Sequence, residues 1–181
     1  MEQKTFEKIK EELLLRAKKA GACQIGYAMG LRSQSKADIL KAITDNWFWV
    51  LRTARIVDAE YLEDNFTEEE LTEAGIYTQK YHEVTTTSFA CGSATVKAYG
   101  SATVKACDSA TVKACDSATV KAYDSATVKA CGSATVEAYE NSYVEDLTGN
   151  IRPQSGYAVI KDYYNHKIYI KKGRYQIVEV D

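Results

Sequence analysis

The most regularly spaced residues that could do chemistry are lysines that recur every eight residues, at Lys97, Lys105, Lys113, Lys121 and Lys129. A regular array of ammonium groups could bind an anionic polymer such as a nucleic acid. The same lysines could also form a solvated surface that opposes aggregation, because Asp108, Asp116 and Asp124 lie close to them in the sequence. We favour the solvated surface and keep DNA binding through the lysines as an alternative.

A run of acidic residues precedes the lysines. Between residues 58 and 73 the chain has no Lys or Arg, and its carboxylates are Asp58, Glu60, Glu63, Asp64, Glu68, Glu69, Glu70 and Glu73. Such an acidic patch could bind a basic partner, although a solvated helical face has the same composition. We predict that this patch is the partner-binding site.

Residue types that support catalysis or metal binding are sparse. His82 and His166 are the only histidines, and neither lies in a metalloprotease motif; nucleophile-elbow, P-loop and dinucleotide fingerprints are also missing. The five cysteines form no CxxC pair, so the usual zinc and dithiol spacings are not met. The sequence therefore predicts a protein that is not an enzyme and uses no metal or cofactor.

An eight-residue repeat positions the lysines. Six near-identical copies, SATVKAYG to SATVEAYE, run from Ser93 to Glu140, and degenerate copies flank them (TTTSFACG and NSYVEDLT). Within each octad Ala, Val and Ala alternate with Ser, Thr and Lys, which is the period of a strand with one buried face. Most copies end in Gly or Asp, which tolerate turns. A repeated strand needs identical neighbours above and below, so the pattern predicts a β-solenoid over residues 85–148.

The small interior residues favour two octads per coil over three. Ala and Val alone fill a thin gap between two sheets, whereas a triangular coil would leave voids that protein cores avoid. Eight octads then make four coils, with Lys97, Lys113 and Lys129 on one face and Lys105 and Lys121 on the other. The seventh octad position alternates between two residue types. Its tyrosines, Tyr99, Tyr123 and Tyr139, would offer contact area to a partner.

Cysteines occupy the other seventh positions. In two-octad coils Cys91 stacks on Cys107, and Cys115 stacks on Cys131, with Cα separations inside the disulfide range. We favour packing at a corner over metal binding or redox sensing for these residues.

Residues 1–80 are predicted to form a helical head with three to five helices. Apolar residues spaced for one helix face begin at Phe6, and Gly21 is a suitable terminator. A capping box at Ser35 and a second at Thr67 each begin a helix, and the latter should end at Gly75. The bulky residues that follow Trp47 predict a further helix that reaches Val57.

Residues 149–181 are predicted to seal the open end of the solenoid as a β-hairpin or meander. Three strands are expected, at Tyr157–Lys161, Lys167–Lys171 and Arg174–Val180, with turns at Asn165-His166 and Lys172-Gly173. The fold class is thus α+β: a helical head, a short β-solenoid and a C-terminal β cap.

Localisation follows from the N-terminus and from the hydropathy. The chain is charged from its second residue, without the apolar segment of a signal peptide, and no apolar run approaches the roughly 18 residues of a membrane span. We expect a cytoplasmic protein with no membrane association.

Two resemblances add to these predictions. The repeats resemble the 16-residue, two-octad coils of bacterial ice-nucleation proteins. The layout as a whole, with Trp47, Tyr61, Asn65-Phe66 and Gly75-Ile76-Tyr77 ahead of SATVKAYD-type octads, resembles small uncharacterised proteins encoded by prophages and mobile elements of gut bacteria. The second resemblance implies a bacterial host and a phage context, in which small acidic non-enzymatic proteins often block host defence.

These observations lead to one functional prediction and two alternatives. We predict a non-enzymatic protein-binding module, an anti-CRISPR-type inhibitor that engages a Cas nuclease such as Cas9, or its nucleic-acid complex, through the acidic patch. The first alternative is a structural solenoid that self-associates as a homo-oligomer or decorates a larger assembly of a phage or mobile element. The second is the DNA binding through the lysines described above.

Overall fold

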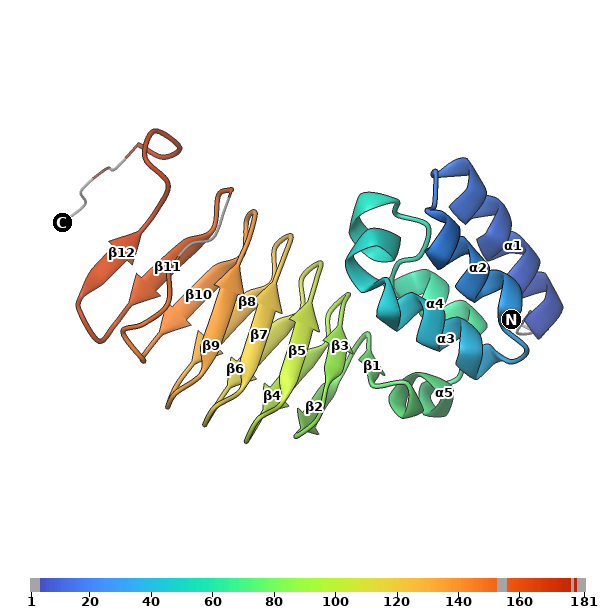
Figure 1. Cartoon of the computed structure of the whole chain (residues 1–181). Coiled ribbons are helices and arrows are strands. Elements are labelled where there is room, and N and C mark those ends of the chain that lie inside the picture. Colours follow the sequence, from blue (N-terminus) through green and yellow to red (C-terminus); the bar gives the residue numbers. More distant parts are fainter. Residues whose placement is uncertain (1–3, 153–155, 177, 179–181) are drawn as a thin grey trace. The chain divides into compact units, whose positions relative to one another are not determined.

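The computed structural model describes residues 4–152, 156–176 and 178. The chain divides into two compact units, Met1–Thr78 and Gln79–Asp181. Helices make up the first unit, and a parallel β-solenoid followed by an antiparallel hairpin makes up the second (Figure 1). The predicted α+β class is therefore confirmed.

The first half of the helical unit contains α1 (Phe6–Lys19), α2 (Gln24–Arg32) and α3 (Lys36–Asp45). Helix α1 buries Ile9 and Leu13, and the chain leaves it through Gly21, whose φ of 75° suits glycine. Helix α3 begins at the predicted cap, where the Ser35 hydroxyl accepts a hydrogen bond from the Asp38 backbone amide at 3.1 Å. Helix α2 was not predicted.

The second half contains a π-helix, η1 (Trp49–Thr53), the helices α4 (Ala59–Asn65) and α5 (Glu68–Glu73), and a two-residue strand, β1 (Ile76–Tyr77). The further helix predicted after Trp47 forms, but it does not reach Val57. The helix ends at Thr53, because Arg55 takes the left-handed conformation, with φ of 49°, and Asp58 then caps α4. The capping box at Thr67 is confirmed. Trp47, Phe66 and Leu62 are among the largest fully buried side chains, so the unit has the expected aromatic core.

Strands of the second unit alternate between two sheets. One sheet contains, in spatial order, β3 (Ser88–Ala90), β5 (Thr103–Ala106), β7 (Thr119–Ala122) and β9 (Thr135–Ala138). The other has the order β12-β11-β10-β8-β6-β4-β2, with β2 at Tyr81–Val84, β4 at Thr95–Ala98, β6 at Thr111–Ala114, β8 at Thr127–Ala130, β10 at Tyr143–Asp146, β11 at Val159–Asp162 and β12 at Lys167–Tyr169.

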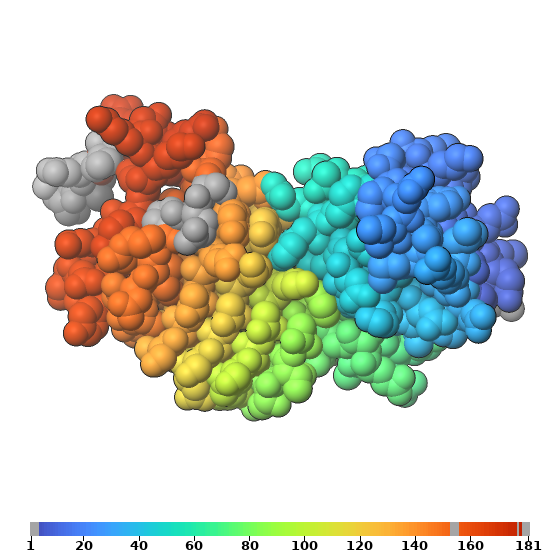
Figure 2. Space-filling view, viewed as in Figure 1, coloured from blue at the N-terminus to red at the C-terminus, as the bar shows by residue number. Residues whose placement is uncertain are grey.

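The register shows that each coil contains two octads, as predicted. Val112 of β6 pairs with Val128 of β8, and Val104 of β5 pairs with Val120 of β7, so equivalent residues lie 16 positions apart. The inward side chains are the alanines and valines of the repeat, which are almost completely buried. Successive coils form adjacent bands in the space-filling view (Figure 2). The interior is therefore the thin, two-sided core that small side chains can fill.

The parallel stack extends beyond the repeats at both ends. Strand β2 pairs with β4 at the N-terminal end. At the C-terminal end β11 pairs in parallel with β10, with Val159 opposite Tyr143, and β12 returns antiparallel to β11. The turn between them contains His166 with φ of 54°, as the predicted Asn165-His166 turn requires.

The third predicted strand of the tail does not form in the described residues of Arg174–Val180, which are 174–176 and 178. Gly173, with φ of 77°, turns the chain away after Lys172. The Tyr175 hydroxyl then donates a hydrogen bond to the Tyr157 carbonyl at 2.6 Å. A side-chain contact therefore replaces the expected strand pairing; residues 177 and 179–181 lie outside the described part of the chain.

Candidate binding surfaces

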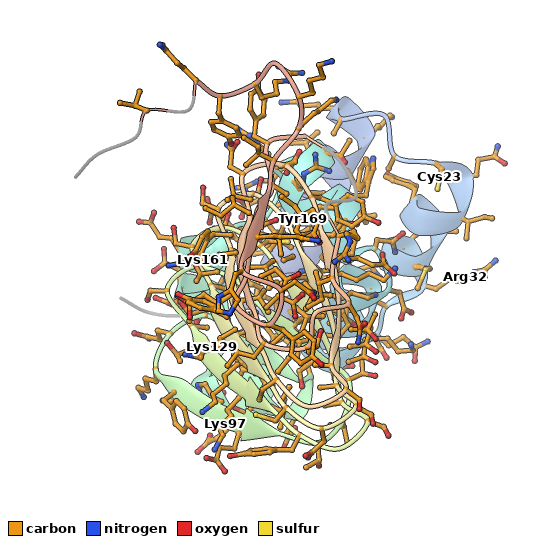
Figure 3. The ribbon with its side chains drawn as sticks, turned by 90° about the vertical axis from the view of Figure 1, so that its left-hand side faces the viewer. Cys23, Arg32, Lys97, Lys129, Lys161 and Tyr169 are labelled. Carbon is orange, nitrogen blue, oxygen red and sulfur yellow. The ribbon has the colours of Figure 1, made fainter. Side chains whose placement is uncertain are left out.

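The lysines form ladders on both faces of the solenoid. Lys97, Lys113 and Lys129 pair in register along one sheet, and Lys105 pairs with Lys121 on the other. Figure 3 shows Lys97, Lys129 and Lys161 following one another along one side of the stack. Lys161 continues the ladder because β11 adds to the same sheet.

Glutamates replace lysine toward the ends of both ladders and form ion pairs with the neighbouring lysines. Lys121 Nζ lies 2.8 Å from Glu137 Oε2, and Lys129 Nζ lies 3.4 Å from Glu145 Oε2. Lys97 Nζ lies 4.0 Å from Glu83 Oε1. These carboxylates reduce the positive potential of both faces, which weakens the case for a polyanion-binding surface.

The predicted contact tyrosines lie on different sheets. Tyr99 follows β4, and Lys97 Nζ lies 4.4 Å from the centroid of its ring. Tyr123 and Tyr139 follow β7 and β9 on the other sheet, where their rings stack 4.5 Å apart. The Tyr139 hydroxyl donates to Glu137 Oε2 at 2.9 Å, and this hydrogen bond raises the pKa of Tyr139 to about 12. The three tyrosines therefore do not form one surface.

The aspartates that end the octads have a structural role that the sequence reading missed. Asp108 and Asp116 adopt positive φ, near 55°. Asp116 Oδ2 accepts a hydrogen bond from the Gly100 backbone amide, in the turn one coil earlier, at 3.1 Å. Asp108 accepts in the same way from Gly92 at 3.2 Å. Each carboxylate therefore ties two successive turns together, a function that the spacing of 16 residues could have indicated.

The cysteines stack as predicted. Cys115 and Cys131 follow β6 and β8, and their Sγ atoms lie 3.2 Å apart. Cys91 and Cys107 follow β3 and β5 on the opposite sheet and are completely buried. The fifth, Cys23, is exposed, and its Sγ accepts a hydrogen bond from the Gly26 amide at the start of α2.

The predicted acidic patch lies on α4 and α5 and on the residues that cap them. Seven of its eight carboxylates are exposed, and Glu70 is partly buried. Asp58 and Glu70 have local structural roles. Asp58 Oδ1 accepts from the Tyr61 amide at 2.7 Å to cap α4, and Glu70 completes the Thr67 capping box and pairs with Lys36 at 3.2 Å. The remaining exposed residues, such as Glu63, Asp64 and Glu73, are the stronger candidates for a partner contact.

Two further features were not predicted. The helical unit contains a largely apolar cavity of about 210 Å³ between α1, α2, α3 and η1, with Leu14, Gly26 and Val50 among its lining residues. At the C-terminal hairpin, Tyr164 and Ile168 are exposed by 71% and 64%. A scan of the tail for apolar residues in turns and edge strands could have found the second feature.

The described part of the chain contains no group of three or more His, Cys, Asp or Glu side chains placed to hold a metal ion. Among those same residues, none of the helices is long and apolar enough to cross a membrane.

The fold and its surfaces define a short two-sided β-solenoid preceded by a helical unit. No protein-family model matches the chain, and comparison with curated proteins and with solved structures finds no significant match.

Proposed function

We propose that the protein is a non-enzymatic binding protein that uses the acidic patch of its helical unit to engage a basic partner. The observation that carries this proposal is the exposure of seven of the eight carboxylates between Asp58 and Glu73, in a run without Lys or Arg. Of these carboxylates, only Asp58 and Glu70 cap a helix. A patch of one sign attracts and orients a partner of the opposite sign.

The resemblance to proteins of prophages and mobile elements suggests the partner. A Cas nuclease such as Cas9 holds nucleic acid in a positively charged channel, which is a surface that an acidic patch can occupy. The β-solenoid would add a stiff body to the inhibitor and hinder access to the channel. The specific proposal is therefore anti-CRISPR-type inhibition in a bacterial host.

The test is a charge reversal that spares the fold. Glu63 lies near the end of α4 and Glu73 is the last residue of α5, where the helix dipole favours positive charge. The double variant Glu63→Lys/Glu73→Lys should therefore fold normally. The control is Glu7→Lys/Glu11→Lys, which makes the same net charge change on exposed positions of α1. Glu7 lies in the first turn of α1, where the helix dipole favours negative charge, so the fold of this variant is verified first by circular dichroism.

Binding to a Cas9–guide complex is measured by pull-down, and DNA cleavage is measured alongside it. We expect the wild type and the α1 variant to bind and inhibit, and the α4–α5 variant to lose both activities. Equal inhibition by both variants would exclude the acidic patch as the contact. Absence of binding by the wild type would exclude this partner.

Self-association is the alternative that one observation favours. The edge strand β12 places Ile168 at the surface, and Tyr164 is exposed in the adjoining turn. An exposed edge with apolar side chains can template pairing with a second chain. Light scattering across a concentration series separates the possibilities, because the average particle mass of a filament-forming protein increases with concentration and that of a monomeric inhibitor does not. Loss of growth in an Ile168→Lys variant would locate the contact at this edge.

A further inference from the structure

The pair formed by Cys115 and Cys131 differs from the other cysteines in combining close approach with access to solvent. Their Sγ atoms lie 3.2 Å apart, and the Cys131 thiol has two acceptors within hydrogen-bond distance, Cys115 Sγ and the Ala114 carbonyl at 3.3 Å. The residues directly before them, Ala114 and Ala130, are partners in the parallel register of β6 and β8. Neighbouring parallel strands lie about 4.8 Å apart, which is within the Cα separation that a disulfide spans.

Exposure separates this pair from its counterpart on the other sheet. Cys115 and Cys131 are partly exposed, whereas Cys91 and Cys107 have no exposed surface. A dissolved oxidant can therefore reach the first pair while the solenoid remains folded, and reaches the second only when the solenoid opens.

We propose that Cys115 and Cys131 form a reversible disulfide between neighbouring coils when the protein meets a low-molecular-weight disulfide such as oxidised glutathione. The Cys115 thiolate attacks one sulfur of glutathione disulfide, and one glutathione thiolate leaves. Cys131 then loses its proton, its sulfur attacks Cys115 Sγ, and the second glutathione leaves. Two cysteine thiols are oxidised, one disulfide is reduced, and the two protons end on the two glutathione molecules.

The environment of the pair sets the order of these steps. Burial raises the pKa of the Cys131 thiol, and its hydrogen bond to Cys115 acts in the same direction. A raised pKa disfavours the thiolate of Cys131, so Cys131 acts as the resolving cysteine and Cys115 meets the oxidant first. The short sulfur–sulfur distance then favours closure over release of a mixed disulfide.

The experiment uses the full chain carrying Cys23→Ser. This change removes the exposed thiol that could link two molecules, and serine is a favourable residue at the N-cap that Cys23 occupies. Four cysteines remain. After incubation of the folded protein with oxidised glutathione, the free thiols are alkylated in denaturant and counted by intact-mass spectrometry. We expect the count to fall from four to two, without an added glutathione and without dimers.

The two cysteines that form the cross-link are identified by substitution, because tryptic peptides cannot distinguish Cys107 from Cys115. Residues 106–113 and 114–121 have the same sequence, ACDSATVK, so the tryptic peptides of Cys107 and Cys115 are identical. In the Cys23→Ser background we expect Cys115→Ser and Cys131→Ser each to abolish the cross-link. Cys91→Ser/Cys107→Ser should retain it. Should Cys115→Ser fold poorly, Cys115→Tyr replaces it, since Tyr99 occupies the equivalent position one coil earlier.

A second readout tests whether the cross-link joins native coils. The oxidised protein should unfold at a higher urea concentration than the reduced protein, and dithiothreitol should reverse the difference. Four free thiols after oxidation, stable glutathione adducts, or a cross-link that survives both single substitutions would each overturn the proposal. A lower unfolding midpoint for the oxidised protein would overturn it as well.

Discussion

Replacing Asp116 by alanine should destabilise the solenoid by about 2 kcal/mol, and replacing it by glycine should cost clearly less. Asp116 has φ of 54°, a conformation that costs alanine about 1 kcal/mol. Its Oδ2 also accepts the Gly100 amide proton at 3.1 Å, a bond with a net value of about 1 kcal/mol. Alanine loses the hydrogen bond to Gly100 and keeps the strain of the positive φ. Glycine forfeits the bond but relieves the strain, so we expect a loss near 1 kcal/mol or below.

Chemical denaturation followed by two probes separates the units of the chain. Both tryptophans, Trp47 and Trp49, belong to the helical unit, so their fluorescence follows that unit while far-UV circular dichroism of the strands follows the solenoid. The Asp116 variants should shift the second transition and leave the first unchanged. Because two transitions are expected, each is fitted by itself.

Two control variants isolate the contributions. Asp116→Asn tolerates the left-handed conformation and keeps an acceptor oxygen, so it should lie closest to the wild type. Gly100→Ala adds a Cβ in open space at φ of 57° and should cost about 1 kcal/mol from strain alone. Equal losses for Asp116→Ala and Asp116→Gly would refute the strain argument, and a loss for Asp116→Asn as large as that for alanine would refute the hydrogen-bond argument.

Three further changes test other parts of the structure. Glu137→Gln removes the carboxylate that raises the pKa of Tyr139 to about 12. The Tyr139 phenol should then ionise at a lower pH, so tyrosinate absorbance, measured against a Tyr139→Phe reference, should increase at a lower pH than in the wild type. A pKa that is raised in the folded state stabilises that state as long as the tyrosine is protonated in the unfolded chain, that is, below pH 10. In the wild type, the contribution of Tyr139 to the free energy of unfolding should therefore decrease between about pH 10 and 12. Val112→Thr places a hydroxyl in a fully buried position and should cost about 1–3 kcal/mol, measured as a lower midpoint of the solenoid transition; an unchanged midpoint would contradict the dry interior. Gly26→Ala adds a Cβ at ordinary contact distance from Asn46, 3.4 Å, and should stabilise α2 by about 0.5–1 kcal/mol, visible as a higher midpoint by tryptophan fluorescence; a lower midpoint would show that α2 packs too tightly for the methyl group.

The repeat made the solenoid predictable, because the same pattern of buried and exposed residues recurs in every octad. A strand period within each octad and an interior of Ala and Val together specify the two-sided coil. The strand predicted at Tyr157–Lys161 forms as β11, and the same pattern could have placed it in the parallel stack. Tyr157–Tyr164 (YAVIKDYY) is a degenerate octad in which Ala158 and Ile160 occupy the buried positions, and both are completely buried. The expectation of a hairpin or meander there concealed the match.

Helix α2 escaped prediction for a physical reason. Helix prediction relies on apolar residues that face the core, and α2 reverses that arrangement. Its Ile25 is 78% exposed and its Leu31 is 56% exposed, while Gly26 and Gly30 lie close to Asn46 and Leu14 of the neighbouring helices. No residue of α2 is fully buried, and glycines lie on the side that faces the neighbouring helices, so the helix carries almost no amphipathic signal in the sequence.

The repetition of the solenoid also bears on where a specific contact can form. Identical octads present identical Thr and Lys side chains, so a ligand that fits one coil fits the next equally well and gains no unique position. Uniqueness requires residues that break the repeat, and these lie toward the ends of the ladders: Glu83 before Lys97, Glu137 after Lys121 and Glu145 after Lys129. Each also forms an ion pair with the lysine beside it. A specific partner of the lysine ladders should therefore be sought where the glutamates replace lysine, because there the ladders distinguish one coil from another.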